Sequence, residues 1–128
     1  MKFTEDTLTA QLVIESYDAD SVSINGRQYR QSLLLSGEGV LDKWAIGTVQ
    51  DLRASHLQPL LDTQPEVILI GTGLKLVFPA MENYGEVMNQ GVGVEFMDTG
   101  AACRTYNILV GEGRRVCAGL ILQAGQGD

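Results

Sequence analysis

The stretch Glu95-Phe-Met-Asp-Thr-Gly-Ala-Ala-Cys-Arg-Thr-Tyr-Asn107 contains the change of hydrophobic period that decides the fold. Val92–Met97 has the composition of a strand, whereas apolar residues from Thr99 to Gly111 recur at helical spacing. Asp98 stands between them as a good N-cap, because its carboxylate can accept hydrogen bonds from the first turn of a helix. The stretch therefore predicts a strand that leads directly into a helix. The predicted buried face of this helix consists of Ala102, Cys103, Tyr106, Leu109 and Val110.

Two further strands flank this unit. Val67–Ile70 is apolar at every position, which suits a strand covered on both faces, and it ends in Gly71-Thr72-Gly73. Gly113 ends the helix, and Val116–Leu122 predicts the last strand. Because strand–helix–strand crossovers are right-handed, these three strands are expected to be parallel.

Two more helices are expected earlier in the chain. Ser55 and Gln58 have the spacing of a capping box, and Leu57, Leu60 and Leu61 supply an apolar face behind them. The other helix is expected to carry Pro79 in its first turn and Gly91 as its left-handed cap. Its predicted core face consists of Met81, Tyr84, Val87 and Met88.

Residues 10–46 predict an antiparallel β meander. Asn25-Gly26 is the strongest short hairpin signal, because both central residues of a type I′ turn need positive φ. Leu33–Ser36 continues as an extended segment, and Trp44 is expected to pack in the core or between layers. We therefore expect one α/β domain of three layers over residues 1–128. Its antiparallel portion (10–46) leads into a β-α-β-α-β portion (47–122), and residues 123–128 form a frayed tail.

Composition narrows the classes of function. The 128 residues carry a net charge of −7, so the chain is expected to bind neither nucleic acid nor anionic membranes. No apolar run approaches the roughly 20 residues that span a bilayer, and Met1–Asp6 lacks the pattern of a secretory signal or presequence. We therefore expect a cytoplasmic protein without direct membrane insertion.

No motif predicts a metal, a nucleotide or a nucleophile. One histidine, His56, and two cysteines, Cys103 and Cys117, are too few for a convincing zinc site. Gly71-Thr72-Gly73 is continued neither as a dinucleotide fingerprint nor as a P-loop. We therefore predict no cofactor and no metal, and the sequence favours a protein that is not an enzyme without deciding the matter.

A site, if there is one, is expected where the parallel strands end. Ligands of open parallel sheets gather at the carboxyl ends of the strands. Gly71–Gly73 and Asp98–Gly100 stand at two such ends, and the second leads into a helix N-terminus, which favours anions. Each residue also has a structural interpretation: a tight strand exit for the glycines and Thr72, and a simple cap for Asp98.

Glu95 and Arg104 leave two alternatives open. Glu95 lies in a strand that we expect to be covered on both faces, where a carboxylate needs a partner such as Arg104, Arg114 or Arg115. The alternative is acid–base catalysis by Glu95 or Asp98, with Arg104 holding an anion. Cys103 is similarly either a small core residue or a thiolate.

Several segments together resemble a known family. Gly71-Thr72-Gly73, the block from Gly91 to Asn107 and Glu112–Val116 resemble a family of small domains. This family includes the mitochondrial respiratory complex I assembly factor three and uncharacterised bacterial proteins. The Asn25-Gly26-Arg27 hairpin, Tyr29 and Trp44 fit the same pattern, so the resemblance covers nearly the whole chain. It implies a fold of β and α layers, and, in the eukaryotic relative, a non-catalytic assembly factor that works with partner proteins. The positions that it singles out are Gly71, Thr72, Gly73, Asp98, Thr99, Cys103, Arg104, Tyr106 and Asn107.

Three hypotheses follow. The first is a non-catalytic interaction domain that helps to assemble a larger complex, such as a bacterial NADH–quinone oxidoreductase, with unknown protein partners. The second is a small-molecule site or enzyme at the strand ends. Its catalytic candidates are Glu95 and Asp98, and its binding candidates are Gly71, Thr72, Gly73, Thr99, Cys103, Arg104 and Asn107. The third is a domain that only forms a homo-oligomer.

Overall fold

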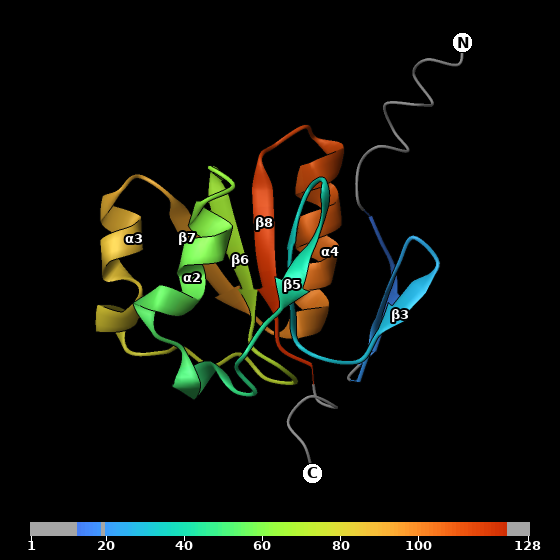
Figure 1. Cartoon of the computed structure of the whole chain (residues 1–128), viewed down its shortest axis with the longest axis horizontal. Coiled ribbons are helices and arrows are strands. Elements are labelled where there is room, and N and C mark those ends of the chain that lie inside the picture. The colour runs from blue at the N-terminus through green and yellow to red at the C-terminus, as the bar shows by residue number, and fades with distance from the viewer. Residues whose placement is uncertain (1–12, 19, 123–128) are drawn as a thin grey trace.

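The computed structural model describes residues 13–18 and 20–122, and in this part of the chain eight strands form two sheets (Figure 1). The smaller sheet has the order β1-β2-β3 and the larger one the order β5-β4-β8-β6-β7. The strands are β1 (Ile14–Tyr17), β2 (Val22–Ile24), β3 (Arg27–Tyr29), β4 (Leu33–Ser36), β5 (Gly39–Lys43), β6 (Val67–Gly71), β7 (Gly93–Met97) and β8 (Val116–Leu120). The helices are α2 (Ala54–Leu61), α3 (Gly85–Asn89) and α4 (Thr99–Gly111), with short 3-10 turns at Val49–Asp51 and Met81–Asn83.

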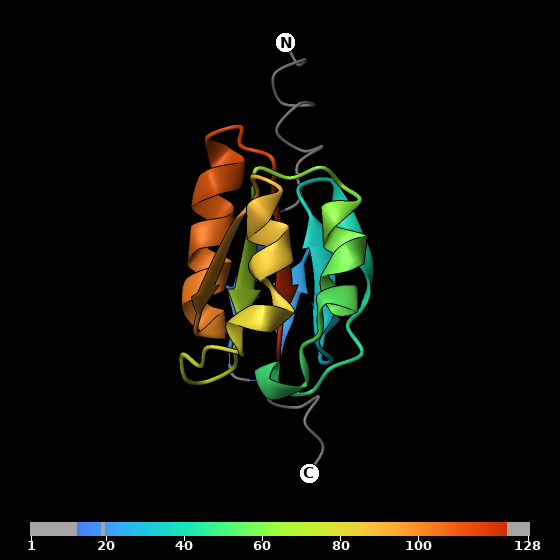
Figure 2. The same cartoon turned by 90° about the vertical axis from the view of Figure 1, so that its left-hand side faces the viewer.

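The larger sheet lies between helices on both faces (Figure 2). Helix α4 packs on one face together with the small sheet, whereas α2 and α3 cover the other face. Alternate residues of β6 point to opposite faces: Val67 and Leu69 join the α4 core, and Ile68 and Ile70 join the α2 core. All five residues of β6 are buried, which confirms the prediction of a strand covered on both faces.

The three strands predicted to be parallel are parallel. β6 pairs with β7 on one side and with β8 on the other, and both pairings are parallel. Helix α4 has the predicted bounds, and its buried residues include Ala102, Cys103 and Tyr106. Asn25 and Gly26 adopt φ of 53° and 80°, which confirms the type I′ hairpin between β2 and β3.

The predicted meander divides between the two sheets after β3. β4 pairs with β5 and with β8, and so belongs to the larger sheet. Leu33, Leu34 and Leu35 are all buried, with consecutive side chains on opposite faces. A strand of this kind needs cover on both sides, which the larger sheet provides and the edge of a small antiparallel sheet does not. The first predicted strand residues, 10–12, and the predicted tail, 123–128, lie outside the described residues.

Trp44 packs in the core, as predicted, against a glycine of the central strand. It is 6% exposed, and its indole N–H donates to the His56 carbonyl over 3.2 Å. A Cβ added at Gly119 would lie 2.6 Å from the nearest ring carbon of Trp44. The missing side chain of Gly119 therefore makes the space that the indole ring fills.

The predicted cap of α2 is wrong. The helix begins at Ala54, so that Ser55 and Gln58 lie inside it and Arg53 is the N-cap residue. The Arg53 N–H donates to Nδ1 of His56 over 2.9 Å, so a histidine ring does the work expected of the glutamine amide. An imidazole acceptor three residues after the cap satisfies the same backbone donor as Glu or Gln in a capping box.

The predicted core face of the next helix is also largely wrong. Pro79 precedes the first turn of this region, and α3 itself has only five residues. Val87 is buried, but Met81 and Met88 are 66% and 45% exposed. The 3-10 turn at Met81–Asn83 interrupts the 3.6-residue period, so residues at helical spacing do not share one face. The predicted cap Gly91 has φ of 86°, which confirms its left-handed conformation.

Candidate functional site

The two special strand ends lie side by side, as predicted. β6 and β7 are neighbours, with Gly71 beside Met97. The Thr72 N–H extends the ladder by donating to the Met97 carbonyl over 2.8 Å. Gly71–Gly73 and Asp98–Gly100 therefore meet at one edge of the sheet.

Thr99 fills the space between these ends. Its hydroxyl donates to the Ile121 carbonyl over 2.7 Å and accepts from the Gly73 N–H over 2.9 Å. Its own N–H donates to the Gly73 carbonyl over 2.9 Å. A Cβ on Gly71 would lie 2.9 Å from the Cα of Thr99, so Gly71 must be glycine for this approach. Thr99 thus joins the ends of β6, β7 and β8 through internal hydrogen bonds.

Thr72 is likewise engaged within the chain. It is buried, and its hydroxyl donates to the Lys75 carbonyl over 2.5 Å and accepts from the Val77 N–H over 3.1 Å. These bonds shape the loop that follows β6. Structural contacts therefore account for the hydroxyl groups of Thr72 and Thr99 and for the missing side chain of Gly71.

The first turn of α4 has little donor capacity left for an anion. The Asp98 carboxylate accepts from the Ala101 N–H over 2.8 Å, which confirms Asp98 as the N-cap, and the Thr99 N–H donates to Gly73. The N–H groups of the first turn have no partner within the helix, and those of Thr99 and Ala101 are already used by other parts of the protein. The ionised cap also offsets the positive end of the helix dipole.

A shallow recess of about 200 Å³ remains beside the strand ends. Tyr17 and Asp18, from the end of β1 and the residue after it, form one side; Gly73, Leu74 and Asp98–Gly100 form the other. The backbone N–H groups of Asp20 and Ser21 donate to the Asp18 carboxylate and hold its pKa below the usual range. Asp18 and Asp98 therefore place two carboxylates on the recess, against the single guanidinium of Arg104 beside Tyr17 and Gly100, and this balance of charge disfavours the anion expected there.

Arg104 is held by Tyr17. Its Nη1 donates to the tyrosine hydroxyl, and its guanidinium carbon lies 5.8 Å from the centroid of the tyrosine ring. Cation–π contacts of this kind occur within about 6 Å of the ring centroid. Arg104 thus fastens β1 to α4 and does not pair with Glu95.

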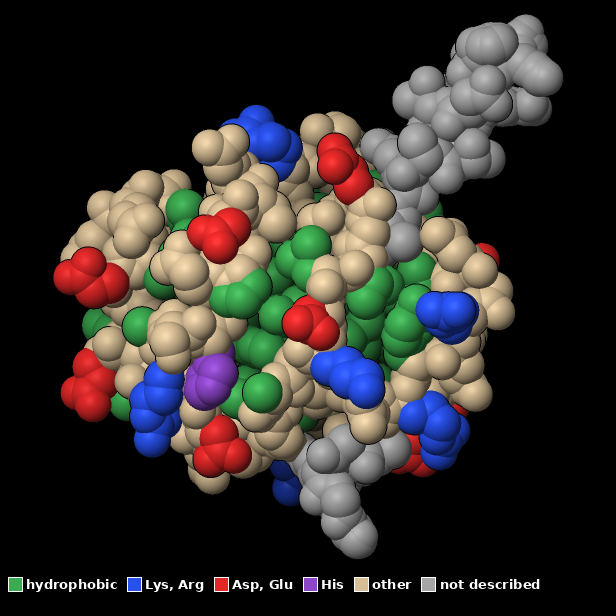
Figure 3. Space-filling view, in the orientation of Figure 1, with side chains coloured by type: hydrophobic (Ala, Val, Ile, Leu, Met, Phe, Trp, Pro, Cys, Tyr) green, Lys and Arg blue, Asp and Glu red, His purple; other side chains and the backbone are tan. Residues whose placement is uncertain are grey.

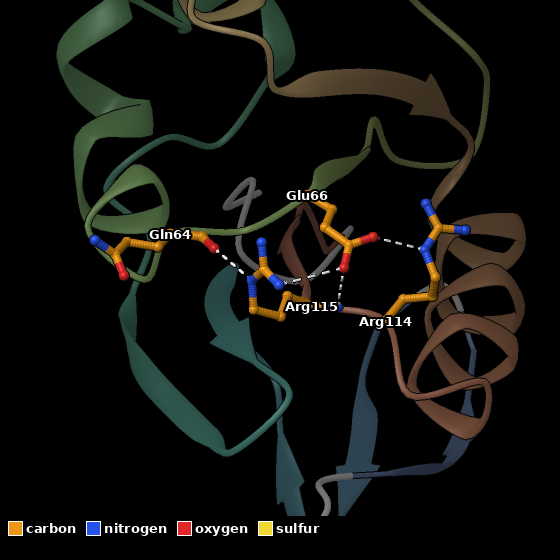
Figure 4. A network of polar contacts seen from close by, with 4 residues as sticks. All are labelled: Gln64, Glu66, Arg114 and Arg115. Atoms are coloured by element: carbon orange, nitrogen blue, oxygen red, sulfur yellow. Dashed lines mark hydrogen bonds and ion pairs between the residues drawn. The ribbon is translucent and has the colours of Figure 1, made fainter.

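The expected environment of Glu95 is wrong. β7 is an edge strand of the larger sheet and Glu95 is exposed, so no buried carboxylate needs an arginine here. Arg114 and Arg115, which were also candidates for its partner, instead bind Glu66, the residue before β6 (Figure 4). Arg114 Nε lies 2.8 Å and Arg115 Nη1 3.5 Å from the oxygens of Glu66.

The remaining residues of α4 that the sequence singled out are buried or bind other parts of the chain. Cys103 is fully buried, and burial raises the pKa of its thiol to about 12, so it is protonated at neutral pH. Asn107 binds one residue twice: its amide donates to the Ile14 carbonyl over 2.8 Å, and its oxygen accepts from the Ile14 N–H over 2.9 Å. The Tyr106 hydroxyl donates to the Ser36 carbonyl over 2.8 Å.

Sequence reasoning missed Tyr17 and Asp18, which complete the recess, and the double hydrogen bond of Asn107. The polar sequence Asp18-Ala-Asp20 is a local signal for a turn, but nothing in it indicates a site. Its position against α4 depends on contacts between residues about 90 positions apart, such as Ile14 with Asn107. No local pattern encodes a contact of this kind.

Residues 13–18 and 20–122 offer neither a metal-binding cluster nor a membrane-spanning helix. No cluster of three or more His, Cys, Asp or Glu side chains there is arranged to hold a metal ion. None of the helices in that part of the chain has the length and apolar character needed to cross a bilayer.

Known proteins are similar to this chain in sequence, and solved structures are similar to it in fold. The "13 kDa major membrane protein" of Francisella tularensis subsp. holarctica is 37% identical over 91% of this chain and 95% of its own length. The "NADH dehydrogenase [ubiquinone] 1 alpha subcomplex assembly factor 3" of Danio rerio is 33% identical; the match covers 88% of this chain and 66% of the longer relative. A crystal structure of a Bordetella parapertussis protein superimposes with a TM-score of 0.83 at 36% identity, covering 88% of this chain and 97% of that one.

These matches confirm the resemblance drawn from the residues, since relatives named complex I assembly factor 3 are among them. They also confirm the α/β fold class. The family model described as "Protein of unknown function (DUF498/DUF598)" matches residues 14–121. The chain therefore belongs to the DUF498/DUF598 family.

Proposed function

We propose that this chain is a non-catalytic, cytoplasmic protein-interaction domain that helps to assemble a respiratory complex of the NADH–quinone oxidoreductase type. The observation that carries the proposal is its likeness, over 88% of its length, to a protein named as an assembly factor for NADH dehydrogenase. The likeness spans only 66% of that relative, so the relative's remaining segments have no counterpart in the match.

The geometry of the motif supports a role without chemistry. A catalytic site needs groups that are free to contact a substrate and that have suitable pKa values. Thr99 and Asn107 instead bind backbone groups of distant segments, and Asp98 caps α4. The residues that single out the family thus stabilise a scaffold, which leaves its surface to make the specific contacts.

The test is deletion of the gene in its own host. We expect a reduced amount of assembled NADH–quinone oxidoreductase on native gels and a matching fall in NADH oxidation by membranes. Normal levels of the assembled complex in the deletion strain would overturn the proposal.

Complementation separates assembly from catalysis. We expect the Glu95→Asp chain to restore the complex as well as the unmodified chain does, because the surface charge is kept and no reaction depends on where the carboxylate lies. A folded Glu95→Asp chain that fails to restore the complex, while still binding the complex subunits, would favour catalysis instead.

A further inference from the structure

The outer edge of β7 carries backbone groups directed away from the sheet. The Gly93 N–H donates to the Glu66 carbonyl over 3.1 Å, and the Met97 carbonyl accepts from Thr72 over 2.8 Å, both toward β6. Consecutive peptide groups alternate sides along a strand, so Gly93, Glu95 and Met97 face β6. The N–H and C=O groups of Val94 and Phe96 therefore point outward, where β7 ends the sheet within the described residues.

An apolar groove of about 330 Å³ lies beside this edge. Phe96 forms its floor, with edge-to-face contacts to Phe78 and Tyr84 at centroid distances of 5.8 and 4.8 Å. Phe78 is 63% exposed and Met81 66% exposed, whereas Val87 of the neighbouring helix α3 is buried. We call this surface the β7 groove. It is lined by Phe78, Met81, Tyr84, Met88, Val94 and Phe96.

The rim of the β7 groove is acidic. Glu82 and Glu86 are exposed on the turn and helix that carry Met81 and Met88. Glu95 borders the groove at the β7 edge, with its side chain on the α4 face, because Val94 and Phe96 face the α2 core. Figure 3 shows acidic side chains over α3, at the left end of the molecule. Lys75, in the loop after β6, is the nearest basic residue along the chain. The surface thus combines backbone hydrogen-bonding groups, exposed apolar side chains and negative charge.

We propose that the β7 groove binds an extended segment of a partner protein, which adds to β7 as a further strand. In this binding mode, main-chain hydrogen bonds provide affinity and pockets for alternate side chains provide specificity. The segment has apolar side chains at alternate positions, directed into the groove, and lysine or arginine on either side that complement the acidic rim. This inference rests on the proposed function, for which it names the chemistry of the partner.

The charges disfavour the other occupants. In a symmetric antiparallel pair of two copies, matching the whole of β7 places Glu95 opposite Glu95, and like charges directly opposite destabilise a sheet pair. Each copy also carries a net charge of −7. An anionic membrane surface is repelled by the same acidic rim. A basic, extended protein segment is the occupant that fits both the edge and the charge.

The test uses a phage-displayed library of random twelve-residue peptides and the folded chain. We expect enriched peptides with alternating apolar residues and flanking lysine or arginine. Measured as synthetic peptides by fluorescence anisotropy, they should bind about tenfold or more weakly to Met81→Ala and to Phe78→Ala. Ile108→Ala is the matched control, because this side chain is 60% exposed on α4, in the layer on the other side of the sheet.

A backbone variant tests strand addition itself. Val94→Pro removes one outward N–H while leaving the bonds to β6, and proline is tolerated on edge strands in this position. We expect it to weaken binding about as much as the groove variants do. The groove variants keep the test valid if Val94→Pro does not fold, since both remove exposed side chains only.

Four results would overturn the inference. These are the absence of any enriched peptide, peptides with acidic flanks, equal affinity for the groove variants and the wild type, and binding to anionic vesicles or self-association in place of peptide binding. The proposed function fails separately. If Met81→Ala and Phe78→Ala fully restore the respiratory complex in the deletion strain, this surface is wrong while the function stands. If the deletion changes nothing, the function fails whatever the peptides do.

Discussion

Thr99→Val tests whether the family motif builds the scaffold or forms a site. Valine has nearly the same shape as threonine but lacks the hydroxyl that joins the ends of β6 and β8. The substitution leaves the Gly73 N–H and the Ile121 carbonyl without this partner, in a place where residue 99 is only 6% exposed. Each buried group left unsatisfied costs about 1–3 kcal/mol, so we expect unfolding to become easier by about 2–6 kcal/mol.

This is a large fraction of the total stability of a domain, which is about 5–15 kcal/mol. For a chain of this length, 1 kcal/mol corresponds to about 4 °C in Tm, so a loss of about 4 kcal/mol lowers Tm by about 15 °C. Urea unfolding followed by circular dichroism measures the change directly. The slope of the free energy against urea should stay the same, because the surface exposed on unfolding does not change.

Two substitutions calibrate the result. Thr99→Ser keeps the hydroxyl and removes one methyl group, so it should cost only about 1 kcal/mol. Thr105→Val, on the half-buried flank of the same helix, should change the stability by about 0.5 kcal/mol or less. A Thr99→Val protein as stable as Thr105→Val would refute the reasoning, since the hydroxyl would then contribute nothing to the fold.

Three further outcomes follow from the same structure. Gly119→Ala should destabilise by about 1–3 kcal/mol, because its Cβ would lie 2.6 Å from the Trp44 ring, and Trp44→Leu in the same chain should recover part of that loss in urea unfolding. The thiols of Cys103 and Cys117, whose pKa values burial raises to about 12, should react with a disulfide reagent at pH 8 only after unfolding; fast reaction of the native chain would contradict their placement. The hydrogen bond from Arg114 lowers the pKa of Glu66 in the folded chain, so Glu66 stabilises the fold relative to Glu66→Gln above pH 4.5. This difference in the free energy of unfolding should disappear as the pH falls through the lowered pKa of the folded chain. A difference that grows in acid would contradict the pairing.

Much of the second half of the fold could be predicted because its signals are local. Val67–Ile70 is apolar at each position, and a strand with this composition must be covered on both faces wherever it lies. Asp98 followed by a helical period predicts the start of α4, because a cap acts on N–H groups only two or three residues away. The Asn25-Gly26 turn is local in the same sense, since positive φ is a property of the residues themselves.

The predictions that went wrong concern neighbours from distant parts of the chain. Glu95 was expected to be buried because its strand was expected to be covered on both faces, but β7 lies at the edge of the sheet and Glu95 is exposed. The order of the strands depends on how the crossovers connect them, and it cannot be predicted from the pattern of hydrophobic residues within β7. Met81 and Met88 were misplaced for a different reason: the 3-10 turn Met81–Asn83 interrupts the helical period before α3, so the two side chains do not share one face.

The sequence by itself determined the family, the α/β class, the parallel strands and the helix that follows Asp98. Short-range physics suffices for these, because period, capping and turn conformation act within a few residues. Only the tertiary structure decided that Thr99, Arg104 and Asn107 bind segments of the chain far from their own positions, and that an apolar groove opens beside β7. Such pairings depend on which surfaces meet when the layers pack. A hydroxyl, a guanidinium or an amide on its own is equally suited to hold a ligand or another part of the chain.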